Sequence, residues 1–282
     1  MSLIGEIMIK IKTLLENSLS QNLALKAEHG LSFFIEKDGK KILFDCSSGG
    51  AALYNAQKMN VNLQELDYIV VSHSHYDHAG GLPELINQGL RVPLYIGQHF
   101  WEEKYAYDGQ QYTYLGCGFN QESLLQKGIP IHTCEKITKV FEGCYLVTDF
   151  KRCYSFEIVP KRFVKKVDEE FIEDDFADEI SMVLESDKGL VVIVGCSHPG
   201  ILNMLTTILE RFSKPIYAVF GGSHLVEADE ERIKKTQELM EIIGIRILGF
   251  NHCTGEEAKH YFLECPGQMN YFHLKSGDCY RL

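Results

Sequence analysis

The sequence predicts an α/β protein, and two regularities support this class. Short runs of β-branched and apolar residues, typical of buried strands, occur along the chain at intervals. Amphipathic segments with a helical period lie between them, and this interleaving is characteristic of α/β proteins. A third observation concerns function, because four potential metal ligands occur within the six residues 73–78, directly after one of the predicted strands.

The first third of the chain contains several of these elements. Asp38-Gly39 separates two apolar runs, which is a strong signal for a hairpin. The segment 67–71 is β-branched and apolar, as expected of a buried strand. The predicted strands are 8–16, 31–36, 41–45 and 67–71, and the predicted helices are 51–59 and 82–88.

The last third repeats strand and helix in turn. Strands are predicted at 190–194, 215–220 and 245–250, and helices at 199–212 and 229–243. Pro199 is suited to the first helical position. The sequence Thr254-Gly255-Glu256-Glu257 reads as a capping box that opens another helix.

The segment His-Ser-His-Tyr-Asp-His at 73–78 has the spacing of a metal site. His73 and His75 are two residues apart, so at an extended strand end they point to the same side. Asp77 and His78 follow where the chain turns and can serve a neighbouring position. Imidazole and carboxylate at this density suit zinc or iron better than calcium or magnesium. A histidine-rich surface loop is the alternative.

Further histidines follow the later strands. His198, His224 and His252 each come after an apolar run and shortly before a predicted helix. Strand ends hold ligands rigidly, which favours a metal site. Several helix starts near one point also provide N–H donors and positive dipole ends, which favour an anionic small-molecule substrate. For any single histidine, a structural role is the alternative.

The pattern His-x-His-x-Asp-His-x-Gly-Gly resembles the signature of the metallo-β-lactamase superfamily. Further segments resemble the subgroup named for 7,8-dihydropterin-6-methyl-4-(β-D-ribofuranosyl)aminobenzene 5′-phosphate synthase. These segments are 28–32, 195–201, 221–225 and 251–255. The resemblance implies a four-layer αββα sandwich, with two mixed sheets face to face and helices outside. It also implies one domain over 1–282, and we expect an aromatic and charged insert at about 98–180.

The resemblance also implies a ligand set for two divalent ions, most simply zinc, with manganese or iron as alternatives. Each residue of the set is carried over from a matching motif position. The first ion would be bound by His73, His75 and His198, and the second by Asp77, His78 and His252. Asp77 is also the expected catalytic residue, as acceptor for the proton of an activated water. Asp45 is expected to brace the ligand loop as a hydrogen-bond acceptor.

The chain departs from the superfamily pattern in two places. No carboxylate follows the strand 215–220, where most members have a bridging aspartate. Gly221-Gly222-Ser223-His224 stands there instead. We expect Ser223 and His224 to contact substrate, with metal ligation or a structural role as alternatives for His224. The second departure is Cys46, which we expect to be a packed residue.

Residues 95–114 are rich in aromatic side chains, which either cover an edge of the fold or form a wall for a flat ring. Lys161, Arg162, Lys165 and Lys166 precede an acidic run. This charged segment is either simply solvated or a flap that brings basic groups to a phosphate.

Composition limits the partners. The chain has 282 residues and a net charge of −11, which argues against nucleic acid and anionic membranes as partners. No secretion signal or long apolar run is evident, so we expect a cytoplasmic protein. Nine cysteines without paired CxxC spacing indicate reduced thiols. The sequence does not predict the oligomeric state.

Three functions agree with these observations. The first is a metal-dependent enzyme acting on a phosphorylated, ring-bearing small molecule, with a pterin phosphate synthase as the specific candidate that the resemblance implies. The second is a general metallo-hydrolase of a thioester, lactone or phosphodiester. The third is a metal-binding sensor without turnover.

Overall fold

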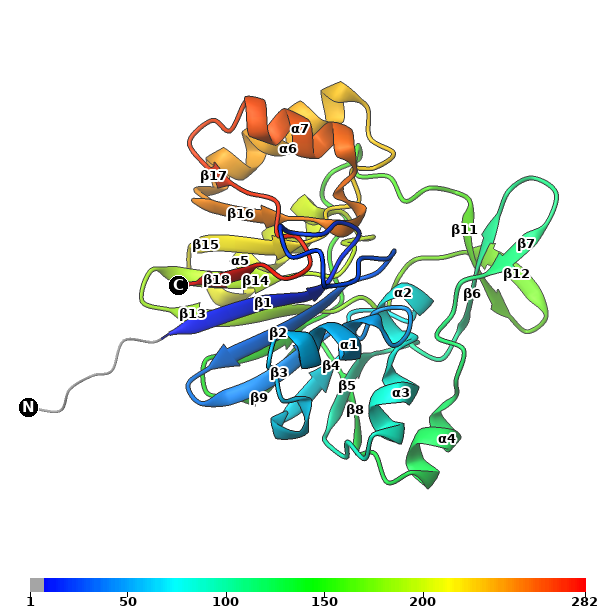
Figure 1. Ribbon diagram of the computed structural model, residues 1–282. Coiled ribbons are helices and arrows are strands. Elements are labelled where there is room, and N and C mark those ends of the chain that lie inside the picture. Colours follow the sequence, from blue (N-terminus) through cyan, green and yellow to red (C-terminus); the bar gives the residue numbers. More distant parts are fainter. Residues whose placement is uncertain (1–7) are drawn as a thin grey trace, which may run out of the picture.

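The computed structural model describes residues 8–282 and has two large sheets packed face to face, with helices on both outer sides (Figure 1). This is the four-layer αββα arrangement that was predicted. The first sheet has the order β18 (Cys279–Arg281), β1 (Ile9–Leu15), β2 (Ser32–Lys37), β3 (Lys40–Phe44), β4 (Tyr68–Val70), β5 (Leu94–Gly97), β8 (Ile131–Cys134). The second has the order β17 (Asn270–Tyr271), β16 (Ile247–Phe250), β15 (Ile216–Gly221), β14 (Gly189–Ile193), β13 (Ser181–Ser186), β10 (Cys144–Val147), β9 (Ile137–Phe141).

Both sheets are mixed. In the first, β1, β2 and β3 pair antiparallel, whereas β3, β4, β5 and β8 run parallel. In the second, β14, β15, β16 and β17 run parallel, and β13 and β10 continue antiparallel. Each sheet therefore has a run of parallel strands whose carboxyl ends lie at one edge, where loops and helix starts meet.

Three apolar clusters hold the layers together. The central cluster joins the two sheets through side chains such as Phe33, Phe44, Leu184 and Phe220. The first outer cluster packs α1 (Ala51–Lys58), α3 (Leu82–Asn87) and α4 (Gln121–Gln126) on the first sheet. The second packs α5 (Ile201–Phe212), α6 (Glu230–Ile243) and α7 (Glu256–Glu264) on the second sheet. The parallel strands β4, β14, β15 and β16 are covered on both faces, which explains their continuous apolar sequences.

Two helix starts differ from the sequence prediction. Pro199 lies before α5, whose N-cap is Gly200, so Pro199 is not the first helical residue. The α5 start is capped from a distance, because Glu157 accepts hydrogen bonds from the Leu202 and Asn203 amides. Thr254 does not cap α7, whose N-cap is Gly255 and has no side-chain cap. The Thr254 hydroxyl instead accepts a hydrogen bond from the Ser223 amide.

The segment 98–180 does not form a single insert. Its strands β8, β9 and β10 belong to the two large sheets, as described above. The remaining strands form a separate four-stranded sheet, β12 (Glu170–Glu173), β11 (Phe163–Val167), β6 (Glu103–Tyr107), β7 (Tyr112–Tyr114). We call this sheet the arm, because it projects from the rest of the molecule (Figure 1). Within residues 8–282, no helix is long and apolar enough to cross a lipid bilayer.

Candidate metal centre

The predicted ligands converge at the carboxyl ends of the parallel strands. His73, His75, Asp77 and His78 lie on the loop after β4 and on the short helix α2 (Tyr76–Ala79). His198 follows β14, and His252 follows β16 at the start of a single 3-10 turn. All six residues are at least 95% buried. Three chain segments that are distant in sequence therefore place their ligand atoms in one interior region.

The first group of ligand atoms belongs to His73, His75 and His198, and these atoms lie within 4.8 Å of one another. The rings are mutually tilted, with centroid separations of 4.7, 4.9 and 5.0 Å. No protein atom hydrogen-bonds to the Nε2 atoms of His73 and His75 or to either ring nitrogen of His198. Buried polar atoms without a partner are costly, and a cation that accepts their lone pairs removes that cost.

Burial keeps these rings neutral. It lowers the pKa of His75 to about 3 and the pKa values of His73 and His198 well below the ordinary value. A neutral imidazole can offer one lone pair to a metal. The Ser72 hydroxyl lies 3.0 Å from Nδ1 of His73 and donates to the Asp45 carboxylate at 2.9 Å. Nδ1 of His73 therefore carries the proton, and its Nε2 offers the lone pair.

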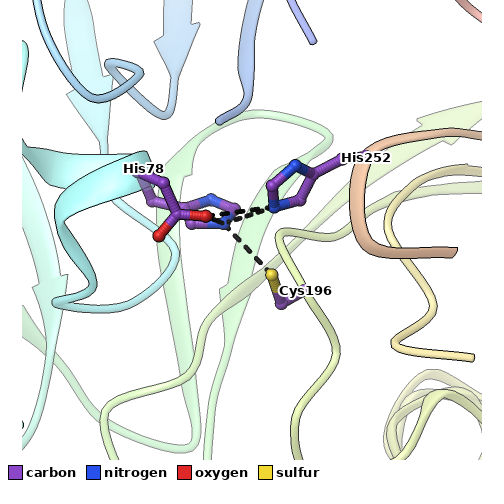
Figure 2. Close-up of side chains that lie close together, drawn as sticks. His78, Cys196 and His252 are labelled. Atoms are coloured by element: carbon purple, nitrogen blue, oxygen red, sulfur yellow. Dashed lines mark hydrogen bonds and ion pairs between the residues drawn. The ribbon is translucent and has the colours of Figure 1, made fainter. Parts of the chain in front are cut away.

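The second group consists of Asp77, His78 and His252, as predicted from the resemblance, together with Cys196. Figure 2 shows His78, Cys196 and His252 pointing toward one another. The Nε2 atoms of His78 and His252 are 3.1 Å apart, and the Cys196 sulfur is 3.1 Å from the same His78 nitrogen. Oδ2 of Asp77 lies 3.5 Å from Nε2 of His78 and 3.3 Å from Nε2 of His252.

Asp45 supports this centre. Its carboxylate accepts hydrogen bonds from the Ser72 amide at 2.7 Å, from the Ser72 hydroxyl, and from Nδ1 of His78 at 2.6 Å. Burial alone would lower the pKa of His78, but Asp45 and Asp77 raise it to about 9. The two carboxylates thus create a negative potential at the second group, which attracts a cation. This geometry fits the bracing role predicted for Asp45.

A second buried network holds the ligand loop from the other side. Oδ2 of Asp178 accepts a hydrogen bond from the amide of Ser74, the residue between His73 and His75, at 2.8 Å. Its Oδ1 is 3.0 Å from Nζ of Lys104, which also pairs with Asp174 at 2.8 Å. Lys104 lies on β6, so this network joins the arm to the loop that carries both histidines.

Phe176 and Glu179 pack against the first group. The Phe176 ring stacks on His198 with a centroid distance of 3.9 Å. Glu179 accepts a hydrogen bond from the Ser197 amide, and its second oxygen lies 3.9 Å from Nδ1 of His73. Burial and the neighbouring Asp178 raise the pKa of Glu179 to about 8.

Several residues around the centre adopt the left-handed backbone conformation that ordinarily favours glycine. Asp45, Ser197, His224 and His252 have φ angles of 62°, 62°, 47° and 48°. Such conformations cost roughly 1–3 kcal/mol each and persist where the surrounding structure imposes them, commonly at functional sites. Their concentration at the strand ends indicates that the fold stabilises this arrangement at the expense of local backbone energy.

His224 belongs to neither group of ligand atoms. Its ring lies 4.4 Å from the His198 ring and 5.7 Å from the Phe163 ring, and burial lowers its pKa to about 4. The amides before it are used within the protein, because Gly222 N–H donates to Gly195 O and Ser223 N–H to Thr254. The Ser223 hydroxyl also donates to Thr254. Gly222 and Ser223 are thus engaged within the protein, and substrate contact by Ser223 and His224 stays a prediction.

The charged and aromatic segments are largely occupied by their own contacts. Lys165 pairs with Glu102 and Asp175, Lys166 with Glu169, and Arg162 with Glu227. Tyr95 and Phe100 are buried in the core. Tyr112 stacks on Phe171 in the arm at a centroid distance of 3.7 Å.

Sequence reasoning missed two residues whose side chains lie within 3.5 Å of the Nε2 or Oδ2 atoms of the second group. The first is Cys196, whose signal was its place two residues before His198 at the end of an apolar strand. The second is His29, whose side chain is 58% exposed and whose Nε2 lies 3.2 Å from Oδ2 of Asp77. His29 lies in the segment 28–32, to which the resemblance assigns no ligand.

The chain is similar in sequence to known proteins. Residues 25–116 match the sequence profile of the metallo-beta-lactamase superfamily. The chain is 30% identical over 271 residues to 7,8-dihydropterin-6-methyl-4-(beta-D-ribofuranosyl)-aminobenzene-5′-phosphate synthase of Methanocaldococcus jannaschii, covering 91% of each chain. It is 28% identical over 263 residues to an uncharacterised protein of the same organism, covering 93% of this chain and 95% of the relative.

A solved structure shares the fold closely. Tm1679, described as a metal-dependent hydrolase of the beta-lactamase superfamily, superposes with a TM-score of 0.83 at 28% identity, covering 96% of this chain and 98% of that one. Both the sequence relationship and the shared architecture extend over nearly the whole chain. The chain therefore belongs to the metallo-β-lactamase superfamily.

Proposed function

We propose that this protein is a metal-dependent enzyme with two adjacent divalent ions, acting on a phosphorylated small molecule that carries an aromatic ring. The observation that carries the proposal is the set of buried ring nitrogens of His73, His75 and His198 that have no partner within the protein. Neutral imidazoles with free lone pairs suit zinc, with manganese and iron as alternatives. The second group would be bound by Asp77, His78 and His252.

Two divalent ions held side by side would polarise a carbonyl or phosphoryl oxygen and lower the pKa of a bound water. The protein residues contribute positioning and charge. Asp45 and the Asp178–Lys104 pair hold the ligand loop in place. Oδ2 of Asp77 faces His78, His252 and the exposed His29, so it is placed to accept a proton and pass it toward solvent through the His29 ring.

The choice of substrate follows the relative in Methanocaldococcus jannaschii. The name of that synthase describes a product that joins a dihydropterin to a ribofuranosylaminobenzene phosphate, so its substrates carry flat rings and a phosphate. Two exposed rings lie next to the metal centre of this chain. The His29 side chain is 58% exposed, Tyr76 is 40% exposed, and the centroids of the two rings are 6.4 Å apart. Exposed rings beside a cationic centre would suit such a substrate.

A general metallo-hydrolase is the second candidate. It is favoured by the similarity to Tm1679, which is described as a metal-dependent hydrolase. Both candidates require turnover, so they differ in kind from a metal-binding sensor. Assays of the metal-loaded protein should include phosphate esters, phosphodiesters, thioesters, lactones and the pterin condensation. Turnover of any of these excludes the sensor, and turnover of none excludes both enzyme candidates.

Elemental analysis of protein purified without chelators tests the metal centre, with about two equivalents expected. His73→Ala should remove the first equivalent and His252→Ala the second. His260→Ala is the matched control, since His260 is an exposed histidine that pairs with Glu264 on α7. Asp77→Asn should lose nearly all turnover while the protein stays folded. Normal metal content in both ligand variants would contradict the proposed centre.

A further inference from the structure

Cys196 occupies a position that the superfamily resemblance did not assign. It follows β14, and its residue is 96% buried. Its sulfur lies 3.1 Å from Nε2 of His78, and the ligand atoms of Cys196, Asp77, His78 and His252 all lie within 4.8 Å of one another. Figure 2 shows the sulfur directed at the space between the two imidazoles.

The hydrogen bonds around this group determine which ring nitrogens hold protons. Nδ1 of His78 donates to the Asp45 carboxylate, which only accepts. Nδ1 of His252 is 2.9 Å from Oδ1 of Asn17, and the Gly30 amide donates to the same oxygen. Because an amide N–H points at that atom, it is the carbonyl oxygen of Asn17, and Nδ1 of His252 donates to it.

Both Nδ1 atoms therefore donate to neighbouring oxygens, and the two Nε2 atoms face each other across 3.1 Å. Oδ2 of Asp77 adds further lone pairs at 3.3 and 3.5 Å. A thiol at Cys196 has one proton and can satisfy only one of these acceptors. A single cation among these atoms can accept a lone pair from each of them, which no single proton can do.

The dimensions suit zinc. Atoms bound to a tetrahedral zinc ion at about 2.0–2.3 Å lie about 3.3–3.8 Å from one another. The four separations given above for this group, 3.1, 3.1, 3.3 and 3.5 Å, are close to such edges. Two nitrogens, one oxygen and one sulfur form a donor set typical of zinc, whereas calcium and magnesium take oxygen ligands.

We propose that Cys196 is the fourth protein ligand of the second ion, bound as a thiolate whose proton is released to solvent when the metal binds. This inference rests on the metal centre proposed above. It supplies an anionic ligand in a chain that lacks a carboxylate after β15, and it makes His224 unnecessary as a ligand. It also gives the two metal positions different roles. The second ion has four protein ligands, whereas the three-histidine position keeps a coordination site for water or substrate.

Cobalt substitution provides a test that does not depend on catalysis. A thiolate bound to Co²⁺ gives a charge-transfer band in the near ultraviolet, which nitrogen and oxygen ligands do not give. The apoprotein should be titrated with Co²⁺ alone and followed by absorbance and by bound metal per chain. The unaltered protein should develop the band as the second position fills.

Cys196→Ala should lose the band and bind the second equivalent at least about tenfold more weakly, the lower end of the effect of losing a supporting residue. Cys196→Asp should also lose the band but retain the second equivalent, because a carboxylate replaces the thiolate. Cys253→Ala is the matched control. Cys253 is a buried neighbour whose sulfur donates to the Cys196 carbonyl and is not among the grouped ligand atoms, so this variant should keep the band.

A band that persists in Cys196→Ala would overturn the proposal, as would a band lost only in Cys253→Ala. If the unaltered protein binds two cobalt ions without the band, the metal centre stands and the role of Cys196 falls. If it binds no cobalt, the proposed metal-dependent function falls as well.

Discussion

The buried Lys104 network offers a quantitative test of how the arm supports the metal centre. The Lys104 side chain is 1% exposed, and its ammonium pairs with Asp174 and Asp178, whose side chains are 1% and 0% exposed. Lys104→Met keeps most of the side-chain volume but removes the charge. The variant leaves two buried carboxylates without a cation. One of them, Asp178, accepts a hydrogen bond from the amide of Ser74, the residue between His73 and His75.

Removing one partner of a buried ion pair typically costs about 3–5 kcal/mol, because the remaining charge is left unpaired. For a domain of this size, that loss corresponds to a fall in melting temperature of roughly 6–20 °C. The double variant Lys104→Met with Asp174→Asn should regain part of the loss, because one of the unpaired carboxylates is removed. Thermal and denaturant unfolding at fixed metal content measure both effects.

The control is Lys166→Met on the neighbouring strand β11. Lys166 pairs with Glu169, whose side chain is 88% exposed. An exposed pair of this kind contributes about 0–1 kcal/mol. If Lys104→Met and Lys166→Met destabilise the protein equally, the reasoning about the buried network is refuted.

Three further predictions follow from the site and its supports. Burial raises the pKa of Glu157 from 4.5 to about 7, so the folded protein binds this proton more tightly than the unfolded chain does. The resulting contribution of Glu157 to the free energy of unfolding is fully present below about pH 4.5. It is lost as the pH rises through about 7, a change of about 3 kcal/mol. Unfolding free energies measured from pH 4.5 to 8 should therefore fall more steeply for the unaltered protein than for Glu157→Gln, and parallel curves would contradict this. Asp45→Asn places an amide NH2 opposite a donor, so metal affinity should fall about 10–100-fold in a competition titration with a chelator, and an unchanged affinity would remove Asp45 from the site. His224→Ala should leave metal content intact and raise KM for phosphorylated substrates more than for phosphate-free ones, whereas a loss of metal would show that His224 is a ligand.

The sequence by itself was sufficient for the class of fold and for most elements in the first and last thirds of the chain, whereas strands such as β5, β8, β10 and β13 were not predicted. Buried parallel strands such as β14 and β16 have continuous apolar sequences because both faces are covered, and that pattern is visible without coordinates. The ligand residues of the loop after β4 could also be recognised from the sequence, because all four occur within six consecutive residues. The four-layer arrangement and the later ligands came from the resemblance to a family, since single histidines carry no such signal.

Contacts between distant segments were decided only by the tertiary structure. Cys196, His29 and the Asp178–Lys104 pair lie at the centre through folding, and no local spacing in the sequence relates them to residues 73–78. Local sequence also failed to predict how two helices are capped. The α5 helix is capped by Glu157, which lies 44 residues before the first residue of the helix, and Thr254 bonds to Ser223 instead of capping α7. Local propensity describes which partners a residue can use nearby, whereas the packed fold determines which partner is within reach.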